Sequence, residues 1–394
     1  MSDVPGIVII GAGQAGLQSA ESLRAGGFQG SITLLGDEPY GPYHRPPLSK
    51  AWLSGEIEAS QLVMRAPELL ARKEIDLRIG VRVHSIDRAA QMLRLADGKA
   101  LPYAGLVLAT GATPRALRLP GADAPNVLAL RTRDDGVRIA EALSVCKSRA
   151  LPVVVIGGGF IGLEVAATAR KLGLEVSVLE ATPRLCARAL VPMLSDWFAE
   201  LHRSHGVGIE LGAKVAAIEV SDGRAVAVRC ADGAVFSCGL VVVGIGVVAN
   251  DQLAFAAGLE CEGGIVVDEC ARTADPMITA AGDCTARRLP DGGLLRLESV
   301  NNATEQAKSA AASLLGLERK FTGTPWFWSD QFGWKLQMAG LPVGADRVEL
   351  RGDMQGDSFS LYHYRGDQLV SADSLNAPKD HLAARKELDK TATL

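Results

Sequence analysis

Two glycine-rich turns in this 394-residue chain have the residue types and spacing that bind dinucleotides: GAGQAG at 11–16 and GGGFIG at 157–162. In a G-x-G-x-x-G turn, the first glycine permits the tight turn and the second lets the backbone approach a pyrophosphate. The third lets the following helix pack close to the strand, and the helix N-terminus supplies N–H groups to the phosphates. These positions are Gly11, Gly13 and Gly16 in the first turn and Gly157, Gly159 and Gly162 in the second. The chain therefore predicts two dinucleotide sites.

An acidic residue follows each turn at the distance from which a carboxylate binds an adenosine ribose. After the first turn this residue is Asp37 or Glu38, and after the second it is Glu180. Because a carboxylate there binds both ribose hydroxyls and repels a 2′-phosphate, Glu180 predicts NADH rather than NADPH. Arg184 and Arg188 lie nearby in the sequence and could weaken that preference.

The loop GPYHRPPLSK at 41–50 is informative for what it lacks. In several flavin-dependent disulfide reductases, a pair of redox cysteines lies at about this distance from the first glycine turn. Here Pro46, Pro47 and Lys50 stand in the loop and no cysteine is present. The chain has seven scattered cysteines without a CxxC or a metal-type spacing: Cys146, Cys186, Cys230, Cys238, Cys261, Cys270 and Cys284. We therefore expect no disulfide relay at the loop, no metal site, and buried thiols in a reducing cytoplasm.

The elements that must position these residues are visible as a repeat. Each glycine turn follows an apolar strand, precedes a helical stretch that ends at glycine, and leads to a second apolar strand that ends near the acid. One such motif alone is a weak signal, but two in this context predict two Rossmann-like βαβ units. If one unit binds a nicotinamide and the other a flavin, a hydride relay between them is chemically reasonable.

The remaining segments predict how the units are joined. Apolar strands at 106–111 and 240–246 flank the second unit, and a helix is expected over 303–315. Beyond residue 321 the composition changes, since four of the nine residues 325–333 are aromatic. Alternating segments at 348–350 and 359–364 favour antiparallel strands. We expect an α/β protein in which one Rossmann-like domain is inserted into another and a small C-terminal α+β domain follows.

Charge and hydropathy exclude several classes of function. The formal net charge of −4 is unlike the basic excess of proteins that bind nucleic acids or membrane surfaces. The N-terminal residues have no signal-peptide pattern, and the apolar run at 240–249 is about half the length of a membrane span. We expect a cytoplasmic protein with no membrane or nucleic-acid partner.

Motifs along nearly the whole chain resemble the oxygenase-coupled NADH–ferredoxin reductases, which include putidaredoxin reductase, rhodocoxin reductase and the reductase components of aromatic-ring dioxygenases. They are VIIGAGQAG, LLGDEPYGPYHRPPLSK, LVLATG, VIGGGFIGLEVAA, AAGDC, ESVNNATEQA and PWFWSDQ. The resemblance implies a glutathione-reductase-like fold with FAD in a domain of residues 1–111 and 244–316. It implies NADH in residues 112–243, and a C-terminal domain at 317–394. Electrons would pass to a [2Fe–2S] ferredoxin that feeds a cytochrome P450 or a Rieske dioxygenase.

The resemblance also implies roles for individual residues. Lys50 resembles the lysine beside the flavin, Glu164 the acid that pairs with it near the nicotinamide, and Asp283 the acid that holds the ribityl chain. FAD contacts beyond the glycines are expected from Ala15, Asp37, Lys50, Val83, Thr110, Gly111, Arg131, Asp283, Val300 and Trp328. NAD contacts are expected from Phe160, Ile161, Glu164, Glu180 and Gly246. A basic surface for ferredoxin is expected among Arg65, Arg72, Lys73, Arg287, Arg288 and Lys335.

Other interpretations of these residues stay open on the sequence alone. Glu164 could be a first-turn helix acid favoured by the helix dipole, Asp283 a helix N-cap, and Trp328 a core residue. For the whole chain, a disulfide reductase needs a cysteine near residues 40–50, which is absent. An NADH-responsive flavoprotein with a binding or signalling role, similar to apoptosis-inducing factor, shares the Lys and Glu pattern, as do other NADH-dependent flavin oxidoreductases.

Overall fold

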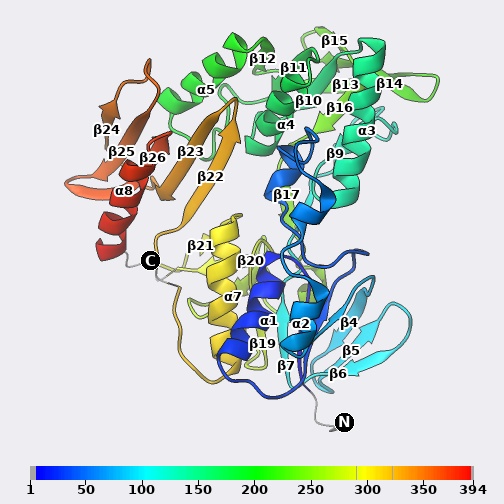
Figure 1. The fold of residues 1–394 in the computed structure, drawn as a ribbon, viewed down its shortest axis with the longest axis vertical. Helices are drawn as coiled ribbons and strands as arrows, with labels where there is room; N and C mark the ends of the chain where they lie inside the picture. Colours follow the sequence, from blue (N-terminus) through cyan, green and yellow to red (C-terminus); the bar gives the residue numbers. More distant parts are fainter. Residues whose placement is uncertain (1–5, 290, 322, 392–394) are drawn as a thin grey trace.

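Parallel sheets flanked by helices form two of the three parts of the molecule, and an antiparallel sheet forms the third (Figure 1). The computed structural model describes residues 6–289, 291–321 and 323–391. The expected α/β class is present, with the small α+β part at its C-terminal end.

The first part is a five-stranded parallel sheet that contains the first glycine turn. Its strand order is β19-β7-β1-β2-β3, with β1 (Ile7–Ile10), β2 (Ile32–Leu35), β3 (Ile75–Arg78), β7 (Gly105–Leu108) and β19 (Ile278–Ala280). Helices α1 (Gln14–Ala25) and α7 (Val300–Leu314) lie side by side (Figure 1). Smaller elements complete this part: α2 (Pro67–Arg72), β4 (Val83–Asp87), β5 (Met92–Leu95), β6 (Ala100–Pro102), α6 (Gln252–Ala256), β18 (Ile265–Val267), β20 (Thr285–Arg288) and β21 (Leu294–Leu295).

The second part repeats this plan around the second glycine turn. Its sheet has the order β12-β11-β10-β16-β9, with β9 (Val127–Ala129), β10 (Val153–Ile156), β11 (Val176–Glu180), β12 (Val207–Leu211) and β16 (Leu240–Val243). The helices are α3 (Arg133–Arg149), α4 (Phe160–Lys171) and α5 (Pro192–Ser204). An antiparallel sheet of β13 (Val215–Ser221), β14 (Arg224–Cys230) and β15 (Val235–Ser237) lies beside them. All four residues of β1, and likewise of β10, are buried, as parallel strands covered on both faces require.

Two short strands connect the parallel sheets. β8 (Ala112–Pro114) leaves the first part and pairs antiparallel with β17 (Val247–Ala249), which returns from the second. Because β19 then joins the first sheet beside β7, segments that precede and follow the second part in the sequence build one sheet. This connectivity agrees with the expected insertion, and the domain limits stay a prediction.

The third part is an antiparallel sheet covered by one helix. Its order is β22-β23-β26-β25-β24, with β22 (Trp326–Gln331), β23 (Trp334–Gly340), β24 (Arg347–Gly352), β25 (Phe359–Arg365) and β26 (Gln368–Leu375). Helix α8 (Pro378–Thr391) packs on β23 and β26 (Figure 1). The two alternating segments expected as strands lie within β24 and β25.

The proline-rich loop folds into a 3-10 helix, η1 (Pro46–Ser49), that packs on α4. Prolines suit its first turn, because their fixed φ is compatible with the helix and their missing N–H has no intrahelical role there. A second 3-10 helix, η2 (Ala59–Leu62), follows. The apolar run at 240–249 divides into buried β16 and then β17. Within the described ranges, no helix is long and apolar enough to cross a membrane.

Candidate active site

A cavity of about 500 Å³ lies at the carboxyl end of the first parallel sheet. Segments that follow β1, β2, β7 and β19 line it, together with η1, the start of α7 and β22. From the second part, Ile161 and Glu164 of α4 reach the wall. The edge beyond the carboxyl ends of the strands is where α/β sheets bind ligands, and the volume suits a cofactor.

The first glycine turn is built for a close backbone approach. Gly11 has a φ of +110°, and a Cβ there would lie 2.1 Å from the carbonyl oxygen of Ala109. A Cβ on Gly16 would lie 1.8 Å from the carbonyl oxygen of Gly11, whereas Gly13 faces open space at the cavity. Gly13 is also the N-cap of α1, whose first N–H groups have no partner inside the helix. The turn therefore offers N–H donors to an anionic group in the cavity.

The second glycine turn repeats this geometry. Gly157 has a φ of +107°, and a Cβ there would lie 2.4 Å from the carbonyl oxygen of Gly244. A Cβ on Gly162 would lie 2.2 Å from the carbonyl oxygen of Gly157, while Gly159 has only one atom within 4 Å, at 3.9 Å. Several predicted NAD residues lie outside the lining of the first cavity: Gly157, Gly159, Phe160, Gly162, Glu180 and Gly246. They form a separate group around the second turn.

Glu180 ends β11 and lies against the second glycine turn. Its carboxylate accepts hydrogen bonds from the Gly158 N–H at 2.6 Å and from the N–H and hydroxyl of Thr182 at 2.8 and 2.7 Å. Arg184 donates instead to the carbonyl oxygens of Ala187 and Leu190. Glu180 is therefore held against the second glycine turn, and the Arg184 guanidinium is already hydrogen-bonded to backbone carbonyl oxygens.

Lys50, whose side chain is 18% exposed, and the buried Glu164 form an ion pair at the wall of the cavity. Lys50 Nζ lies 2.7 Å from Glu164 Oε2, and the Glu164 side chain is only 2% exposed. Glu164 also accepts from the hydroxyls of Ser49 at 2.5 Å and Ser329 at 2.6 Å. Thr168 of α4 donates to the Ser49 carbonyl oxygen at 2.8 Å, which fixes η1 against the helix. Glu164 is therefore a buried acceptor that joins three elements. The first-turn interpretation is wrong, because the first turn of α4 contains no acidic residue.

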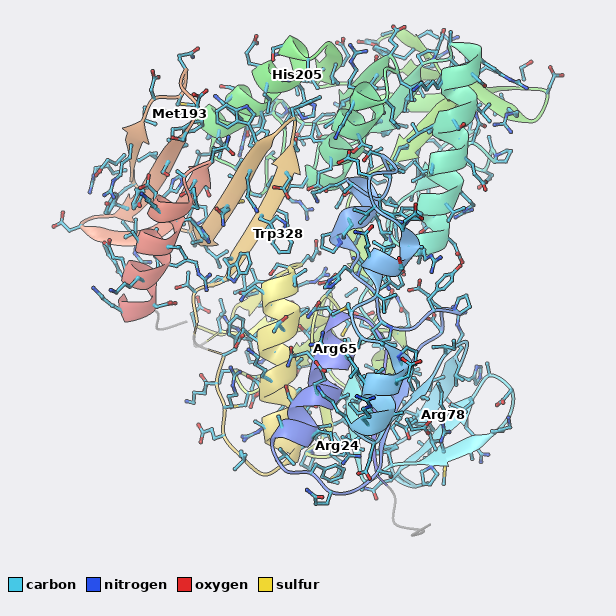
Figure 2. The ribbon with its side chains drawn as sticks, viewed as in Figure 1. Arg24, Arg65, Arg78, Met193, His205 and Trp328 are labelled. Atoms are coloured by element: carbon cyan, nitrogen blue, oxygen red, sulfur yellow. The ribbon has the colours of Figure 1, made fainter. Side chains whose placement is uncertain are left out.

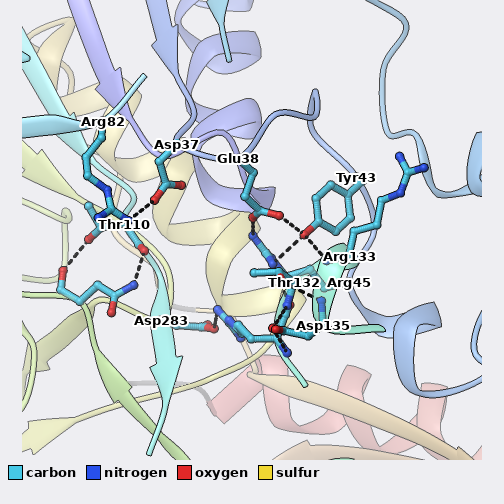
Figure 3. A network of polar contacts seen from close by, with 12 residues as sticks. Asp37, Glu38, Tyr43, Arg45, Arg82, Thr110, Thr132, Arg133, Asp135 and Asp283 are labelled. Atoms are coloured by element: carbon cyan, nitrogen blue, oxygen red, sulfur yellow. Dashed lines mark hydrogen bonds and ion pairs between the residues drawn. The ribbon is translucent and has the colours of Figure 1, made fainter. Parts of the chain in front are cut away.

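A second polar network joins residues that line the cavity (Figure 3). Arg131 Nη2 lies 2.8 Å from Asp283 Oδ2, and Arg45 donates to the Arg131 carbonyl oxygen at 2.8 Å. Arg45 also pairs with Glu38 at 2.6 Å, and the Tyr43 hydroxyl donates to Glu38 at 2.5 Å. Burial, with the hydrogen bond to Glu38, raises the pKa of Tyr43 far above its usual value, so it stays a donor. Because β20 follows Asp283, the N-cap interpretation of this residue is wrong.

The two candidate acids after β2 differ in their freedom. Both oxygens of Glu38 are engaged by Arg45 and Tyr43. The Asp37 side chain is 57% exposed and has Arg82 at 3.4 Å as a partner. Both residues line the cavity, so Asp37 is the carboxylate that remains open to a ribose.

The other predicted residues of the first site mostly reach the cavity. Its lining includes Ala15, Thr110, Gly111, Val300 and Trp328. Val83 does not line it: this residue begins β4, packs against a hydrophobic cluster, and the preceding Arg82 lines the cavity instead. Trp328 lies 5.4 Å from Trp326 between ring centroids, so it lines the cavity and packs at the same time.

Sequence reasoning missed residues whose types are ordinary. Tyr43, Arg45 and Ser49 line the cavity and stand in the quoted loop, where only Lys50 was expected to act. Ser329 lies one position beyond Trp328 in the PWFWSDQ motif. The motif resemblance that pointed to Lys50 and Trp328 could also have identified these four neighbouring residues.

The predicted basic surface is partly occupied by internal pairs. Arg65 and Lys73 both pair with Glu21, and Arg288 pairs with Glu260. Arg287 is only 4% exposed and donates to the Phe321 carbonyl oxygen, and burial lowers its pKa. Arg287 was therefore wrongly expected at the surface.

The cysteines take no part in the cavity. All seven are unpaired, six are buried, and none lines the cavity: Cys146, Cys186, Cys230, Cys238, Cys261, Cys270 and Cys284. Burial raises the pKa of the Cys186 thiol to about 12 and that of Cys238 to about 11. Among the residues that the structure describes, no group of three His, Cys, Asp or Glu side chains could hold a metal ion.

Comparisons with known proteins agree with this arrangement. The family model described as pyridine nucleotide-disulphide oxidoreductase matches residues 5–307, and the model described as reductase C-terminal matches residues 326–394. Rhodocoxin reductase of Rhodococcus erythropolis is 48% identical over 383 residues, covering 97% of this chain and 89% of that protein. The ferredoxin–NAD(+) reductase component of the anthranilate 1,2-dioxygenase system of Burkholderia cepacia is 42% identical over 381 residues, covering 96% and 93%.

A solved structure matches the whole fold. It is the ferredoxin reductase for the CYP199A2 system from Rhodopseudomonas palustris, with a TM-score of 0.94 and 42% identity over 99% of this chain and 96% of that one. The predicted resemblance and the predicted fold class are therefore both confirmed.

Proposed function

The chain belongs to the pyridine nucleotide-disulphide oxidoreductase family, and from this premise we propose that it is an NADH-dependent, FAD-containing ferredoxin reductase. It passes electrons from NADH to a [2Fe–2S] ferredoxin that feeds an oxygenase, either a cytochrome P450 or a Rieske dioxygenase. The observation that carries the proposal is the Lys50–Glu164 ion pair, which joins the first cavity to the helix after the second glycine turn. The names of the relatives, which include a dioxygenase-system ferredoxin–NAD(+) reductase component, support the same activity.

FAD fits the cavity of the first part. The Gly11–Gly16 turn and the N-terminus of α1 would hold the pyrophosphate, and Asp37 would accept from the adenosine ribose. Asp283, held by Arg131, would bind the ribityl chain. When bound, FAD supplies two-electron acceptance from a nicotinamide and one-electron release to an iron–sulfur partner.

Lys50 and Glu164 contribute to the proposed reaction by holding a positive and a negative charge at the wall of the cavity. The Lys50 ammonium at the wall would stabilise negative charge that a bound cofactor gained in the cavity on reduction. Glu164 holds that ammonium in place and neutralises it in the resting protein. The two seryl hydroxyls on Glu164 keep the carboxylate from moving with the lysine.

NADH would occupy the group of residues around the second glycine turn. Gly157, Gly159 and Gly162 would admit the pyrophosphate, with Phe160 and Ile161 beginning the helix. Glu180 lies against this turn, which suits recognition of an unmodified ribose and repulsion of a 2′-phosphate. We therefore propose NADH over NADPH.

The absence of cysteine from the cavity lining supports an outside electron acceptor. A disulfide reductase would need a thiol pair in contact with the flavin, and the loop at 41–50 presents Lys50 instead. No feature of the described residues favours the NADH-responsive binding protein over the reductase, and the relatives are reductases.

The finer assignments belong to the same proposal. We propose the FAD-binding domain at 1–111 and 244–316, the NADH-binding domain at 112–243 and the C-terminal domain at 317–394. A cytoplasmic location is supported by seven unpaired cysteines, which a reducing compartment preserves.

The proposal is tested with the purified protein, NADH and a [2Fe–2S] ferredoxin. We expect bound FAD without intrinsic iron, and reduction of the ferredoxin that is fast with NADH and slow with NADPH. Lys50→Met should slow flavin reduction by NADH more than it weakens NAD⁺ binding. A protein that binds FAD and NADH but leaves every ferredoxin tested oxidised would contradict the reductase assignment.

A further inference from the structure

A line of buried hydrogen bonds leads from the Lys50–Glu164 pair into the interface between α5 and β22. Ser329 Oγ donates to Glu164 Oε1 at 2.6 Å and lies 3.0 Å from Gln331 Nε2, and Gln331 Oε1 lies 2.7 Å from His202 Nε2. None of the four side chains is more than 2% exposed. We call Glu164, Ser329, Gln331 and His202 the Glu164 chain.

The negative charge on Glu164 determines which group donates and which accepts in each hydrogen bond of the Glu164 chain. A carboxylate that is paired with Lys50 has no proton to give, so at 2.6 Å Ser329 must donate its single hydroxyl proton to Glu164. Ser329 can then only accept from Gln331, which must turn its NH₂ group toward the serine. The amide oxygen of Gln331 therefore faces His202 and needs a donor there.

This direction requires one tautomer of His202. The ring must carry its proton on Nε2, because Gln331 presents an acceptor to that nitrogen. His202 Nδ1 has no partner among the described residues. An unpaired acceptor there is less costly than an unpaired buried N–H, so the Nε2–H form suits both nitrogens. Burial lowers the pKa of His202 to about 4, so the ring is neutral near pH 7.

We propose that Ser329, Gln331 and His202 are positioning residues for the Lys50–Glu164 pair: the chain from His202 commits the Ser329 hydroxyl to Glu164 and so holds the carboxylate in place for Lys50. Ser49 holds the other carboxylate oxygen from η1. The pair is thus fixed from two sides by hydroxyls that come from different parts of the molecule.

Strand β22 is suited to this role because its alternate residues face the second part. Phe327 packs on Phe160 at 4.8 Å between ring centroids, Ser329 bonds to Glu164, and Gln331 bonds to His202. Residues at a period of two share one face of a strand. The strand therefore lies against α4 and α5 through three successive contacts. Trp328, labelled in Figure 2, belongs to the same strand and lines the cavity.

The Glu164 chain ends at His202, close to the exposed C-terminal end of α5. The His202 ring packs edge-on against Phe332 at 5.0 Å, and Phe332 stacks on His205 at 4.0 Å. Figure 2 shows His205 at the C-terminal end of α5, away from Trp328. These aromatic contacts hold the His202 ring in the orientation that the chain needs.

The first test is the tautomer of His202 in the FAD-loaded protein. The chain has six histidines, so ¹⁵N ring signals can be assigned by the signal lost in His202→Gln. We expect a neutral ring with its proton on Nε2 at pH 7. A ring protonated on Nδ1, or on both nitrogens, would overturn the proposal. The effect on the flavin rests on the proposed function, but the tautomer is measured whatever the protein reduces.

The second test uses serine variants with a matched control. Ser329→Ala removes the donor to Glu164, whereas Ser360→Ala removes a buried serine of the same sheet that donates to Asp380 at 2.9 Å. Stopped-flow reduction of the flavin by NADH should slow about tenfold in Ser329→Ala, within the range that misplaced catalytic groups cause, and stay unchanged in Ser360→Ala. Ser329→Thr, which keeps the hydroxyl, should restore most of the rate.

Gln331→Met tests the next link. Ser329 keeps its hydroxyl but loses the donor that directs it, so we expect a rate between those of Ser329→Ala and Ser360→Ala. Equal rates for Gln331→Met and Ser360→Ala would remove Gln331 and His202 from the proposal. Equal rates for Ser329→Ala and Ser360→Ala would overturn it entirely, even if the protein still reduced ferredoxin.

Discussion

Removing the positive partner of a buried carboxylate should cost more stability than removing both charges. In Lys50→Met, Glu164 would remain 2% exposed with only the Ser49 and Ser329 hydroxyls as donors. At an effective dielectric constant of about 20, charges separated by the observed 2.7 Å attract by about 6 kcal/mol. Desolvation offsets much of that attraction, and breaking a buried pair typically costs about 3–5 kcal/mol. Because two hydroxyls remain, we expect about 3 kcal/mol.

A double-mutant cycle measures this effect. Urea unfolding of the FAD-loaded protein, Lys50→Met, Glu164→Gln and the double variant gives the coupling free energy between the two side chains. We expect the double variant to be more stable than Lys50→Met, since glutamine carries no buried charge. If the two single losses simply add, the pair is not coupled in the folded protein, and the electrostatic reasoning about Glu164 is refuted.

Three further outcomes are expected from other parts of the molecule. Glu180→Gln should narrow the preference for NADH over NADPH by about tenfold. Repulsion between two anions about 4 Å apart is worth about 1–4 kcal/mol, and a tenfold change corresponds to about 1.4 kcal/mol. An unchanged ratio of the kcat/KM values for the two nucleotides would remove Glu180 from the ribose site. Gly11→Ala should abolish FAD retention, since its Cβ would lie 2.1 Å from the Ala109 carbonyl oxygen, whereas Gly27→Ala, with φ +88° and nothing within 4 Å, should retain FAD; equal FAD contents by absorbance would contradict this. The free energy of unfolding should decrease in acid. Burial lowers the pKa of His202 and His381 to about 4 in the folded protein, whereas a histidine of the unfolded chain has a pKa of about 6.5. As the pH falls, the unfolded chain therefore takes up protons first and is favoured. The stability that the two neutral histidines contribute is complete above about pH 6.5 and is lost as the pH falls toward 4. His202→Gln should flatten the curve of the urea midpoint against pH. An equal slope in the variant would show that His202 is not buried in its neutral form.

The features that the sequence predicted best are those with a local cause. The glycine turns at 11–16 and 157–162 are recognisable because a positive φ and a carbonyl oxygen near 2 Å from any Cβ allow no other residue at Gly11 or Gly157. Strands such as β1 and β10 follow from short apolar runs that parallel sheets bury on both faces. Lys50, Glu164 and Asp283 were predicted through motif resemblance, and the structure brings Lys50 and Glu164 together although they are 114 positions apart.

The features that the sequence did not predict depend on tertiary contacts. Ser329 and Gln331 stand in the quoted PWFWSDQ motif, but their partners, like that of His202, come from other parts of the chain, so the sequence does not show which contacts they make. Arg287 has the same type as the surface arginines, but β20 places it under Phe321. Adjacent residues of a strand point to opposite faces, so Val83 packs against the core while Arg82 lines the cavity. An error of one residue in the expected position is enough to exchange the two.

The central claim is that electrons taken from NADH leave the protein to an outside one-electron carrier and not to a thiol of the chain. The most direct measurement reduces the FAD-loaded protein with one equivalent of NADH without oxygen, then mixes it with two equivalents of oxidised [2Fe–2S] ferredoxin while counting free thiols. We expect both ferredoxin equivalents to be reduced, with the thiol count of the chain unchanged before and after. Consumption of NADH with oxidised ferredoxin remaining, or a change of two thiols during the cycle, would contradict the account.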